Sequence, residues 1–214
     1  MIWWCIIIDI IKISAFVLLS TFYVIYFVKM LLLKRQNIQG NILGKGQKPK
    51  EKARFETILR FVTLLGVPIK FVSVIWAKLL WSIPMLPMIR YSGLILMLFG
   101  MIMFLLAVIT LRNNWRAGYS YEQDTQLVTN GIYKFSRNTA FIGFDLIYIG
   151  CTLTFPNILN VTFAFLVVVM FHTQILGEEV FLSKKFGQNY LEYKAKVGRY
   201  ITISGLKRKH ESEI

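Results

Sequence analysis

Acidic residues are scarce in this chain: 11 Asp and Glu stand against 25 Lys and Arg, and the four types together make up only 17% of the residues. Apolar residues reach 56%, which is too high for a soluble fold of this size. Several windows hold about 18 or more mostly apolar residues, the length that a helix needs to cross roughly 30 Å of hydrocarbon. We therefore expect an all-α integral membrane protein.

Cysteine and histidine are also rare, and the common motifs of soluble enzymes are missing. The two cysteines, Cys5 and Cys151, lie in apolar stretches without CxxC spacing, so neither a zinc site nor a disulfide framework is indicated. The chain has two histidines and no GxGxxG, GxxxxGK[ST], HExxH or GxSxG pattern. These absences disfavour metal-dependent hydrolysis and serine-triad chemistry, and we expect no metal.

No removable signal is indicated at the N-terminus, because no basic residue precedes the first apolar run and no small-residue cleavage pattern follows it. We read it as a permanent anchor. Five spans are predicted, at 1–33, 55–80, 91–111, 139–155 and 158–176. The turn Pro156-Asn157 is so short that the last two spans must form an antiparallel hairpin.

Basic residues alternate between the loops. Residues 34–56 hold seven Lys and Arg, residues 112–138 hold four and the tail from 177 holds eight, whereas the intervening turns hold only Arg90. The positive-inside rule then predicts an external N-terminus and a cytoplasmic C-terminus, in a bacterial cell membrane. This distribution accounts for the net charge of +14 without a nucleic-acid partner.

Lys70 lies two residues after Pro68 inside the second predicted span, near the middle of the bilayer. An intramembrane lysine is a candidate functional residue. The alternative is that its long stem reaches toward water at a proline kink.

The segment 181–197 places its apolar and aromatic residues near one helical face and its lysines on the other, with Gly187 as a break. Such a cytoplasmic amphipathic helix either rests on the membrane surface or folds back over the end of the bundle. We expect one membrane domain over residues 1–205 and a disordered basic tail over 206–214.

Polar residues that suit a ligand site come from three places near the predicted cytoplasmic side. They are Arg116, Thr125, Gln126, Tyr133, Arg137 and Asn138 before the fourth span; His172, Gln174, Glu178 and Glu179 near the end of the fifth; and Tyr190, Tyr193 and Arg199 in the tail. Taken separately, each has a structural explanation; Asn130-Gly131, for example, is typical of a type I′ hairpin. Together, a Glu pair facing an Arg-Asn pair suits a zwitterionic nucleoside cofactor.

The stretch LVTNGIYKFSRNTAFIG resembles the LVTxGxYxxxRHPxYxG signature of the isoprenylcysteine carboxyl methyltransferase family. The EE...L..FG..Y.EY...V pattern of the tail resembles the same family, so the likeness covers about residues 115–201. It implies a membrane methyltransferase that holds S-adenosylmethionine at the cytoplasmic ends of its helices and admits a lipid-like or amphipathic acceptor between them. It leaves the oligomeric state open.

The resemblance also implies roles for individual residues. Cofactor contacts are expected at Thr125, Gln126, Leu127, Val128, Tyr133, Arg137, Asn138, Thr139, Ala140, Phe141 and Glu178. The chain departs from the signature where Asn138-Thr139 replaces His-Pro, Phe141 replaces Tyr and Thr125 replaces a common His. Gln174 stands where the enzyme acting on prenylcysteine has an arginine for its substrate carboxylate, so we expect Gln174 at the acceptor site.

Methyl transfer from a sulfonium needs an in-line acceptor and exclusion of water more than acid or base help. A carboxylate acceptor needs no base; for an amine or hydroxyl, Glu179 or His172 is the candidate catalytic base. Two alternatives remain open: an NADPH-dependent enzyme similar to sterol reductases, and a non-catalytic membrane protein that keeps the fold.

Overall fold

The computed structural model describes residues 2–77, 83–119 and 125–202, and this part is helical apart from one isolated bridge between Asn41 and Ala117. The α-helices are α1 (Ile2–Arg35), α2 (Lys50–Ile75), α3 (Pro87–Leu111), α4 (Thr139–Thr154), α5 (Ile158–Phe186) and α6 (Gln188–Lys196). Two short 3-10 helices, η1 (Arg112–Asn114) and η2 (Gly131–Lys134), lie between α3 and α4.

The multi-pass membrane character is carried by four helices, α1, α2, α3 and α5, which are long and apolar enough to cross a bilayer. Helix α4 is apolar but has only 16 residues, or roughly 24 Å of helix. The predicted set of five full-length spans is therefore not confirmed. Helix α2 also ends at Ile75 rather than residue 80, although it continues through Pro68.

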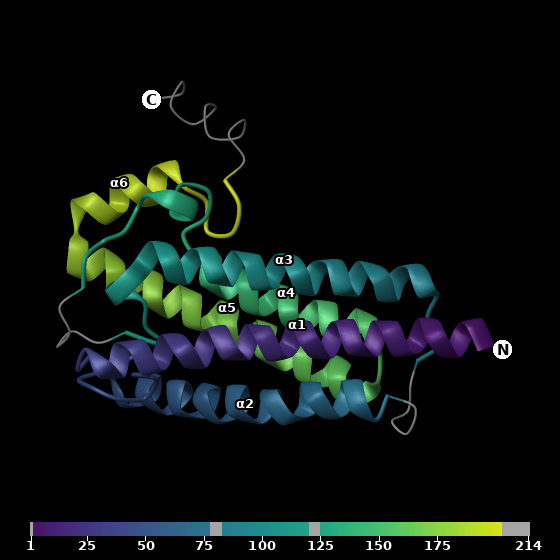
Figure 1. The fold of residues 1–214 in the computed structure, drawn as a ribbon. Helices are drawn as coiled ribbons and strands as arrows, with labels where there is room; N and C mark the ends of the chain where they lie inside the picture. Colours follow the sequence, from purple (N-terminus) through teal and green to yellow (C-terminus); the bar gives the residue numbers. More distant parts are fainter. Residues whose placement is uncertain (1, 78–82, 120–124, 203–214) are drawn as a thin grey trace.

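The long helices run up and down beside one another, with the N-terminus at one end of the bundle and α6 at the other (Figure 1). Helices α4 and α5 pack together as the predicted antiparallel hairpin. Asn157 precedes the first residue of α5, and its side-chain oxygen accepts a hydrogen bond from the Asn160 amide at 2.8 Å. This N-cap satisfies a backbone donor that the helix itself leaves without a partner.

Helices α3 and α4 approach each other most closely, because glycines face backbone across their contact. A Cβ atom on Gly100 would lie 2.7 Å from the Gly143 carbonyl oxygen, and one on Gly143 would lie 2.8 Å from the Gly100 oxygen. Gly93 and Gly150 repeat the arrangement one heptad away on each helix, at 2.5 and 2.6 Å. Small residues permit this close backbone approach, as is common in membrane helix pairs.

An aromatic cluster fills the space between α1, α3 and α4. Phe22 and Phe104 are fully buried and their ring centroids lie 5.0 Å apart. Phe144 from α4 packs on both rings, at 5.1 and 5.0 Å. Trp115, just after α3, closes the cluster edge-on to Phe104 at 5.9 Å. The C-terminal end of α3 is thereby fixed against α1 and α4.

Lys70 neither reaches water nor lines a pocket described below. Its side chain is fully buried, and its ammonium donates to the Asn160 side-chain oxygen and, at 3.3 Å, to the Tyr148 carbonyl. These contacts tie α2 to the α4–α5 hairpin. The expectation of a lysine reaching toward water is wrong, and the contacts give Lys70 a packing role.

Helix α5 extends ten residues beyond the predicted end of the last span and stops at Phe186. Gly187, at φ +54°, confirms the predicted break between this helix and α6. Helix α6 buries Tyr190 and Tyr193 and exposes Lys194 and Lys196. It therefore folds back onto the bundle through its aromatic residues. The predicted disordered tail lies outside the described residues.

Candidate functional site

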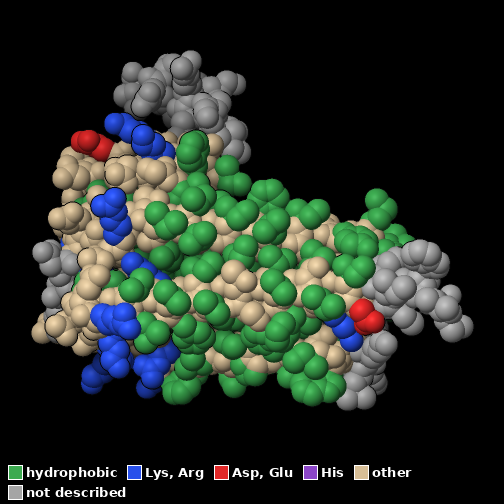
Figure 2. All heavy atoms as spheres, viewed as in Figure 1, with side chains coloured by type: hydrophobic (Ala, Val, Ile, Leu, Met, Phe, Trp, Pro, Cys, Tyr) green, Lys and Arg blue, Asp and Glu red, His purple; other side chains and the backbone are tan. Residues whose placement is uncertain are grey.

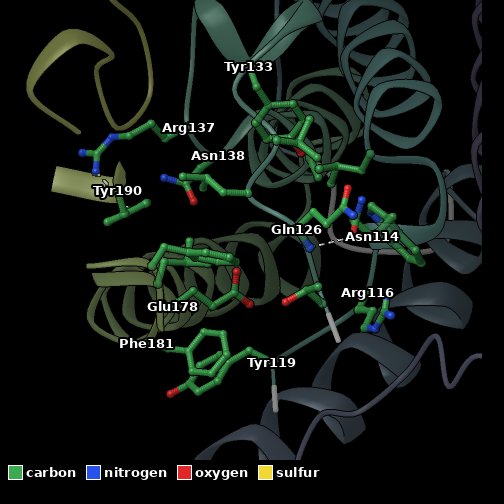
Figure 3. A pocket seen from close by; sticks show the side chains of 18 of the residues that line it. Asn114, Arg116, Tyr119, Gln126, Tyr133, Arg137, Asn138, Glu178, Phe181 and Tyr190 are labelled. Atoms are coloured by element: carbon green, nitrogen blue, oxygen red, sulfur yellow. Dashed lines mark hydrogen bonds between the residues drawn. The ribbon is translucent and has the colours of Figure 1, made fainter. Parts of the chain in front are cut away.

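A pocket of about 160 Å³ lies at the end of the bundle where α6 folds back. Its walls come from the end of α3, the loop before α4, the start of α4, the last turns of α5, and α6 (Figure 3). We call it the polar pocket. Among the residues that line it are Asn114, Arg116, Tyr119, Thr125, Gln126, Leu127, Val128, Tyr133, Arg137, Asn138, Ala140, Phe141, Glu178, Phe181, Tyr190 and Tyr193.

The loop before α4 forms one wall and is not a hairpin. Asn130 is extended at φ −97° and Gly131 begins the 3-10 helix η2, so the type I′ turn that Asn130-Gly131 suggested is wrong. Gly131 has a positive φ and lies against Thr110, which leaves no room for a side chain. The 3-10 turn directs Tyr133 into the protein, where burial raises the pKa of its phenol above the ordinary value. Tyr133 is therefore neutral at physiological pH.

Asn138 and Thr139 stabilise the start of α4 in place of the His-Pro of the signature. The Asn138 side-chain amide donates to the Arg199 carbonyl at 3.1 Å, and the Asn138 backbone amide donates to the Ser136 hydroxyl at 3.1 Å. The Thr139 hydroxyl donates to the Ser136 carbonyl at 3.2 Å. Thr139 is fully buried and does not line the polar pocket, so the structure does not place it at the cofactor contact that the resemblance implied.

Glu178 lies on the last turns of α5, and its carboxylate is directed into the polar pocket (Figure 3). One carboxylate oxygen, Oε1, accepts a hydrogen bond from the Gln174 amide at 3.0 Å. Below it, the rings of Phe181 and Tyr119 stack with centroids 4.4 Å apart and planes at 23°. The pocket thus combines a carboxyl group that can accept hydrogen bonds with a flat apolar surface.

Arg137 supplies positive charge on the opposite side of the polar pocket. Its guanidinium donates to the Tyr190 hydroxyl at 3.2 Å and lies 3.2 Å from a Glu179 oxygen. The third nitrogen, Nε, is buried and has no hydrogen-bond partner in the described part of the chain. A buried donor without a partner costs about 1–3 kcal/mol.

A latch of two ion pairs holds the C-terminal segment across the polar pocket. Arg199 donates from Nε and from a terminal nitrogen to the two oxygens of Glu179, both at 3.0 Å, while Arg137 pairs with the same carboxylate. The hydrogen bonds from Arg199 to Glu179 raise the pKa of the guanidinium. On the inner side of α6, the Tyr193 hydroxyl donates to the Tyr133 carbonyl at 2.7 Å. Helix α6 is therefore fixed by charge and by aromatic packing.

Replacing Arg199 with glutamine is expected to loosen α6 without unfolding the bundle. Glu179 keeps Arg137, and the Arg199 side chain is 34% exposed, so we expect a loss of about 1 kcal/mol, or fivefold in the opening equilibrium of α6. Hydrogen exchange of the backbone amides of residues 188–197 measures this change. Lys196 is exposed on α6, so Lys196→Gln is the control and should leave exchange unaltered. Equal exchange rates in the two variants would contradict the latch.

A second, more apolar pocket of about 110 Å³ lies between α1, α2, α4 and α5. Tyr23, Tyr26, Phe27, Leu59, Leu64, Val67, Phe144, Tyr148 and Phe171 supply most of its aromatic and aliphatic wall. Five residues line both this apolar pocket and the polar pocket: Trp115, Arg116, Gly118, Ala140 and Phe141. The two pockets therefore share one wall, built from the start of α4 and the segment after α3.

Gln174 lines the apolar pocket, but its amide is already engaged. Its nitrogen donates to Glu56 and to Glu178, both at 3.0 Å, and its oxygen accepts from Lys52 at 2.9 Å. Glu56 is fully buried and also pairs with Lys48. An amide nitrogen has only two hydrogens, and both are used in these bonds. Gln174 therefore lies at the expected site of the methyl acceptor, but it has no hydrogen-bond donor left for an anionic substrate.

The structure separates the sequence-predicted site residues into three groups. Ten of the eleven predicted cofactor residues line the polar pocket, all except Thr139. Gln174 lines the apolar pocket. The two candidate bases line neither pocket: Glu179 is paired with arginines, and His172 is exposed beside the Tyr200 hydroxyl at 2.7 Å. Neither is placed for base catalysis at the shared wall.

Sequence reasoning missed Asn114, Tyr119 and Phe181. Asn114 accepts a hydrogen bond from the Gln126 amide at 2.9 Å and so positions the start of the pocket loop (Figure 3). Phe181 belongs to the apolar face that the tail pattern identified, but it lies on the last turns of α5 and not on a separate amphipathic helix. For Tyr119, nothing in the local pattern indicates the stacking with Phe181.

Comparisons with known proteins find similarity over about half of the chain. The profile of the family described as Phospholipid methyltransferase matches residues 88–189. The chain is 33% identical over 113 residues to a probable protein-S-isoprenylcysteine O-methyltransferase of Oryza sativa subsp. indica, which covers 51% of this chain and 59% of that protein. It is 33% identical over 109 residues to the Homo sapiens protein-S-isoprenylcysteine O-methyltransferase, covering 50% and 38%.

The Saccharomyces cerevisiae protein-S-isoprenylcysteine O-methyltransferase is 40% identical over 78 residues, which is 36% of this chain and 33% of that protein. These matches span less than two thirds of each relative's length. The family profile includes the segment after α3 and the start of α4, which form the shared wall, and these comparisons confirm the resemblance found in the motifs. Over about half of its length, the chain is similar to proteins of the isoprenylcysteine carboxyl methyltransferase family.

Proposed function

We propose that this protein is an integral membrane methyltransferase that moves a methyl group from S-adenosylmethionine to an amphipathic, lipid-like acceptor. The observation that carries the proposal is the shared wall between a polar and an apolar pocket. A water-soluble donor and a lipid-dissolved acceptor require two such compartments that touch at one point, because the reacting atoms must come within about 3–3.5 Å. Methyltransferase relatives support this reading over the NADPH-dependent one.

The residues of the polar pocket fit this donor. The Oε2 oxygen of Glu178 is available for ribose hydroxyls. The Arg137 guanidinium, whose Nε has no hydrogen-bond partner among the described residues, supplies positive charge for a carboxylate. The Phe181 and Tyr119 rings offer a stacking surface for an adenine base. Bound there, S-adenosylmethionine supplies an electrophilic methyl group on a sulfonium.

The protein's own contribution is orientation and exclusion of water. Ala140 and Phe141 at the start of α4 belong to both pockets, so they separate them and define the point of contact. Helix α6 covers the pocket from outside and is held there by the latch. A carboxylate acceptor would take the methyl group from the donor without any proton transfer. This reaction needs no base, which agrees with the positions of Glu179 and His172.

The proposal includes a membrane orientation. Lys and Arg side chains gather at the end of the bundle that carries the polar pocket and α6, whereas the opposite end carries few (Figure 2). We propose that this end lies in the cytoplasm with the N-terminus outside, for example in a bacterial cell membrane, because anionic lipid and the positive-inside rule favour that orientation. The donor pocket then opens to the cytoplasm, where S-adenosylmethionine is made. In this proposal the protein is a single membrane domain.

Binding of the donor's product tests the proposal directly. Purified full-length protein in lipid nanodiscs should bind S-adenosylhomocysteine with a Kd on the order of 1–100 µM by calorimetry, within the range common for enzyme ligands. NADPH should neither bind nor compete with radiolabelled S-adenosylmethionine. Absence of heat from S-adenosylhomocysteine, with circular dichroism showing an intact helical fold, would refute the methyltransferase reading; heat from NADPH alone would favour the reductase alternative.

A further inference from the structure

Arg60 places a cationic side chain in the wall of the apolar pocket. It lies on α2, outside the region that the family profile matches, and shares the pocket wall with Thr63 and Leu64. Among the described residues its guanidinium makes no hydrogen bond and no ion pair. The guanidinium carbon lies 5.9 Å from the centroid of the Phe61 ring, which is a cation–π contact. Arg60 is therefore a cation without a counter-ion in an apolar compartment.

The surroundings make this isolation costly. Arg60 lies ten residues into α2, roughly 15 Å along a helix that is long and apolar enough to span the bilayer. Cations at such positions usually pair with anions or line a polar cavity. The acidic residue one turn away, Glu56, is already engaged by Lys48 and Gln174. Arg60 is half-buried, and no acidic side chain of the described residues pairs with it.

Other groups in the apolar pocket cannot take the same role. The nitrogen of Gln174 is committed to two carboxylates. Arg116 lines both pockets and donates to the Asn113 carbonyl at 2.5 Å. Arg60 lines the apolar pocket alone, on the side where Phe27 and Leu64 are 51% and 54% exposed toward the lipid. It is thus the charged residue nearest to where a membrane-dissolved molecule would enter.

We propose that Arg60 is the specificity-determining residue for the acceptor and binds an acidic group, a carboxylate or a phosphate, carried on an apolar chain. This inference rests on the proposed function, since the apolar pocket is taken as the acceptor site. The acceptor molecule enters between α1 and α2. Its apolar chain packs against the aromatic wall of the apolar pocket, and its acidic group pairs with the Arg60 guanidinium. Arg60 would then bind the anion that the resemblance assigns to an arginine at the position of Gln174.

The test uses full-length protein in nanodiscs of uncharged lipid, with S-adenosylhomocysteine present. Three fluorescent single-chain probes of equal length are compared, ending in a carboxylate, a phosphate or an alcohol. Wild-type protein should bind one or both acidic probes about tenfold or more tightly than the alcohol. Arg60→Gln should remove that preference and Arg60→Lys should retain part of it. The matched control Arg54→Gln, an exposed change on the same helix, should keep it.

The two acidic probes identify the source of the anion: tighter carboxylate binding indicates a fatty or amino acid head, and tighter phosphate binding indicates a phospholipid-like head. Equal binding of all three probes by the wild type, or an unchanged preference in Arg60→Gln, would overturn the role of Arg60. Binding of S-adenosylhomocysteine in the same samples separates this failure from failure of the proposed function. Arg60→Lys keeps the test decisive if Arg60→Gln does not fold.

Discussion

Replacing Glu178 with alanine is expected to raise the Kd for S-adenosylhomocysteine by about 10- to 100-fold. A hydrogen bond to a charged group contributes about 1.5–3 kcal/mol, and Glu178 is the carboxylate that lines the polar pocket. Its Oε1 is held by Gln174, which fixes the rotamer and leaves Oε2 for the ligand. Glu178→Gln should have an intermediate effect, because the amide keeps a hydrogen-bond acceptor and loses the charge.

Calorimetric titration measures this effect, and Glu192→Ala is the matched control because Glu192 is exposed on α6. Gln174 keeps its hydrogen bond to Glu56 in the Glu178→Ala variant, so the fold should remain intact. A Kd for Glu178→Ala within twofold of wild type, with Glu192→Ala equally unchanged, would remove Glu178 from the donor site.

Replacing Gly143 with valine is expected to lower the free energy of unfolding by about 3 kcal/mol or more. A Cβ at this position would lie 2.8 Å from the Gly100 carbonyl oxygen and 2.9 Å from the Phe104 nitrogen. These are backbone atoms of α3, which cannot move aside as a side chain does, so the helices must separate. Separation would also displace Phe141 and the wall between the two pockets.

Gly177→Val is the matched control for this prediction. At Gly177 the nearest atoms to a new Cβ are the end of the Lys52 side chain, at 2.3 and 2.8 Å, and a flexible side chain can give way. Thermal unfolding in detergent, followed by tryptophan fluorescence, should show a large fall in Tm for Gly143→Val and a small one for Gly177→Val. Equal Tm values would show that the α3–α4 crossing tolerates a side chain.

The pattern of apolar runs determined the membrane class and most helix positions, because burial in lipid requires long apolar helices whatever their neighbours are. The family motifs identified ten of the residues that line the polar pocket. Helix ends were less well predicted. The polar residues Glu178 and Glu179 interrupt the apolar pattern, yet α5 continues through them because neighbouring arginines and Gln174 satisfy their charge.

The sequence by itself determined that this chain is helical, membrane-embedded and equipped with a family-specific cofactor motif, since local composition and spacing encode these properties. Only the tertiary structure decided which polar residues meet. Glu178 and Glu179 are adjacent in sequence, but they lie on different faces of α5, so one enters the polar pocket and the other binds Arg137 and Arg199. Likewise, Lys70 and Arg60 are both basic residues within one apolar helix, and the sequence does not distinguish them. The packing of the neighbouring helices gives Lys70 its hydrogen-bond partners and leaves Arg60 without an ion pair among the described residues.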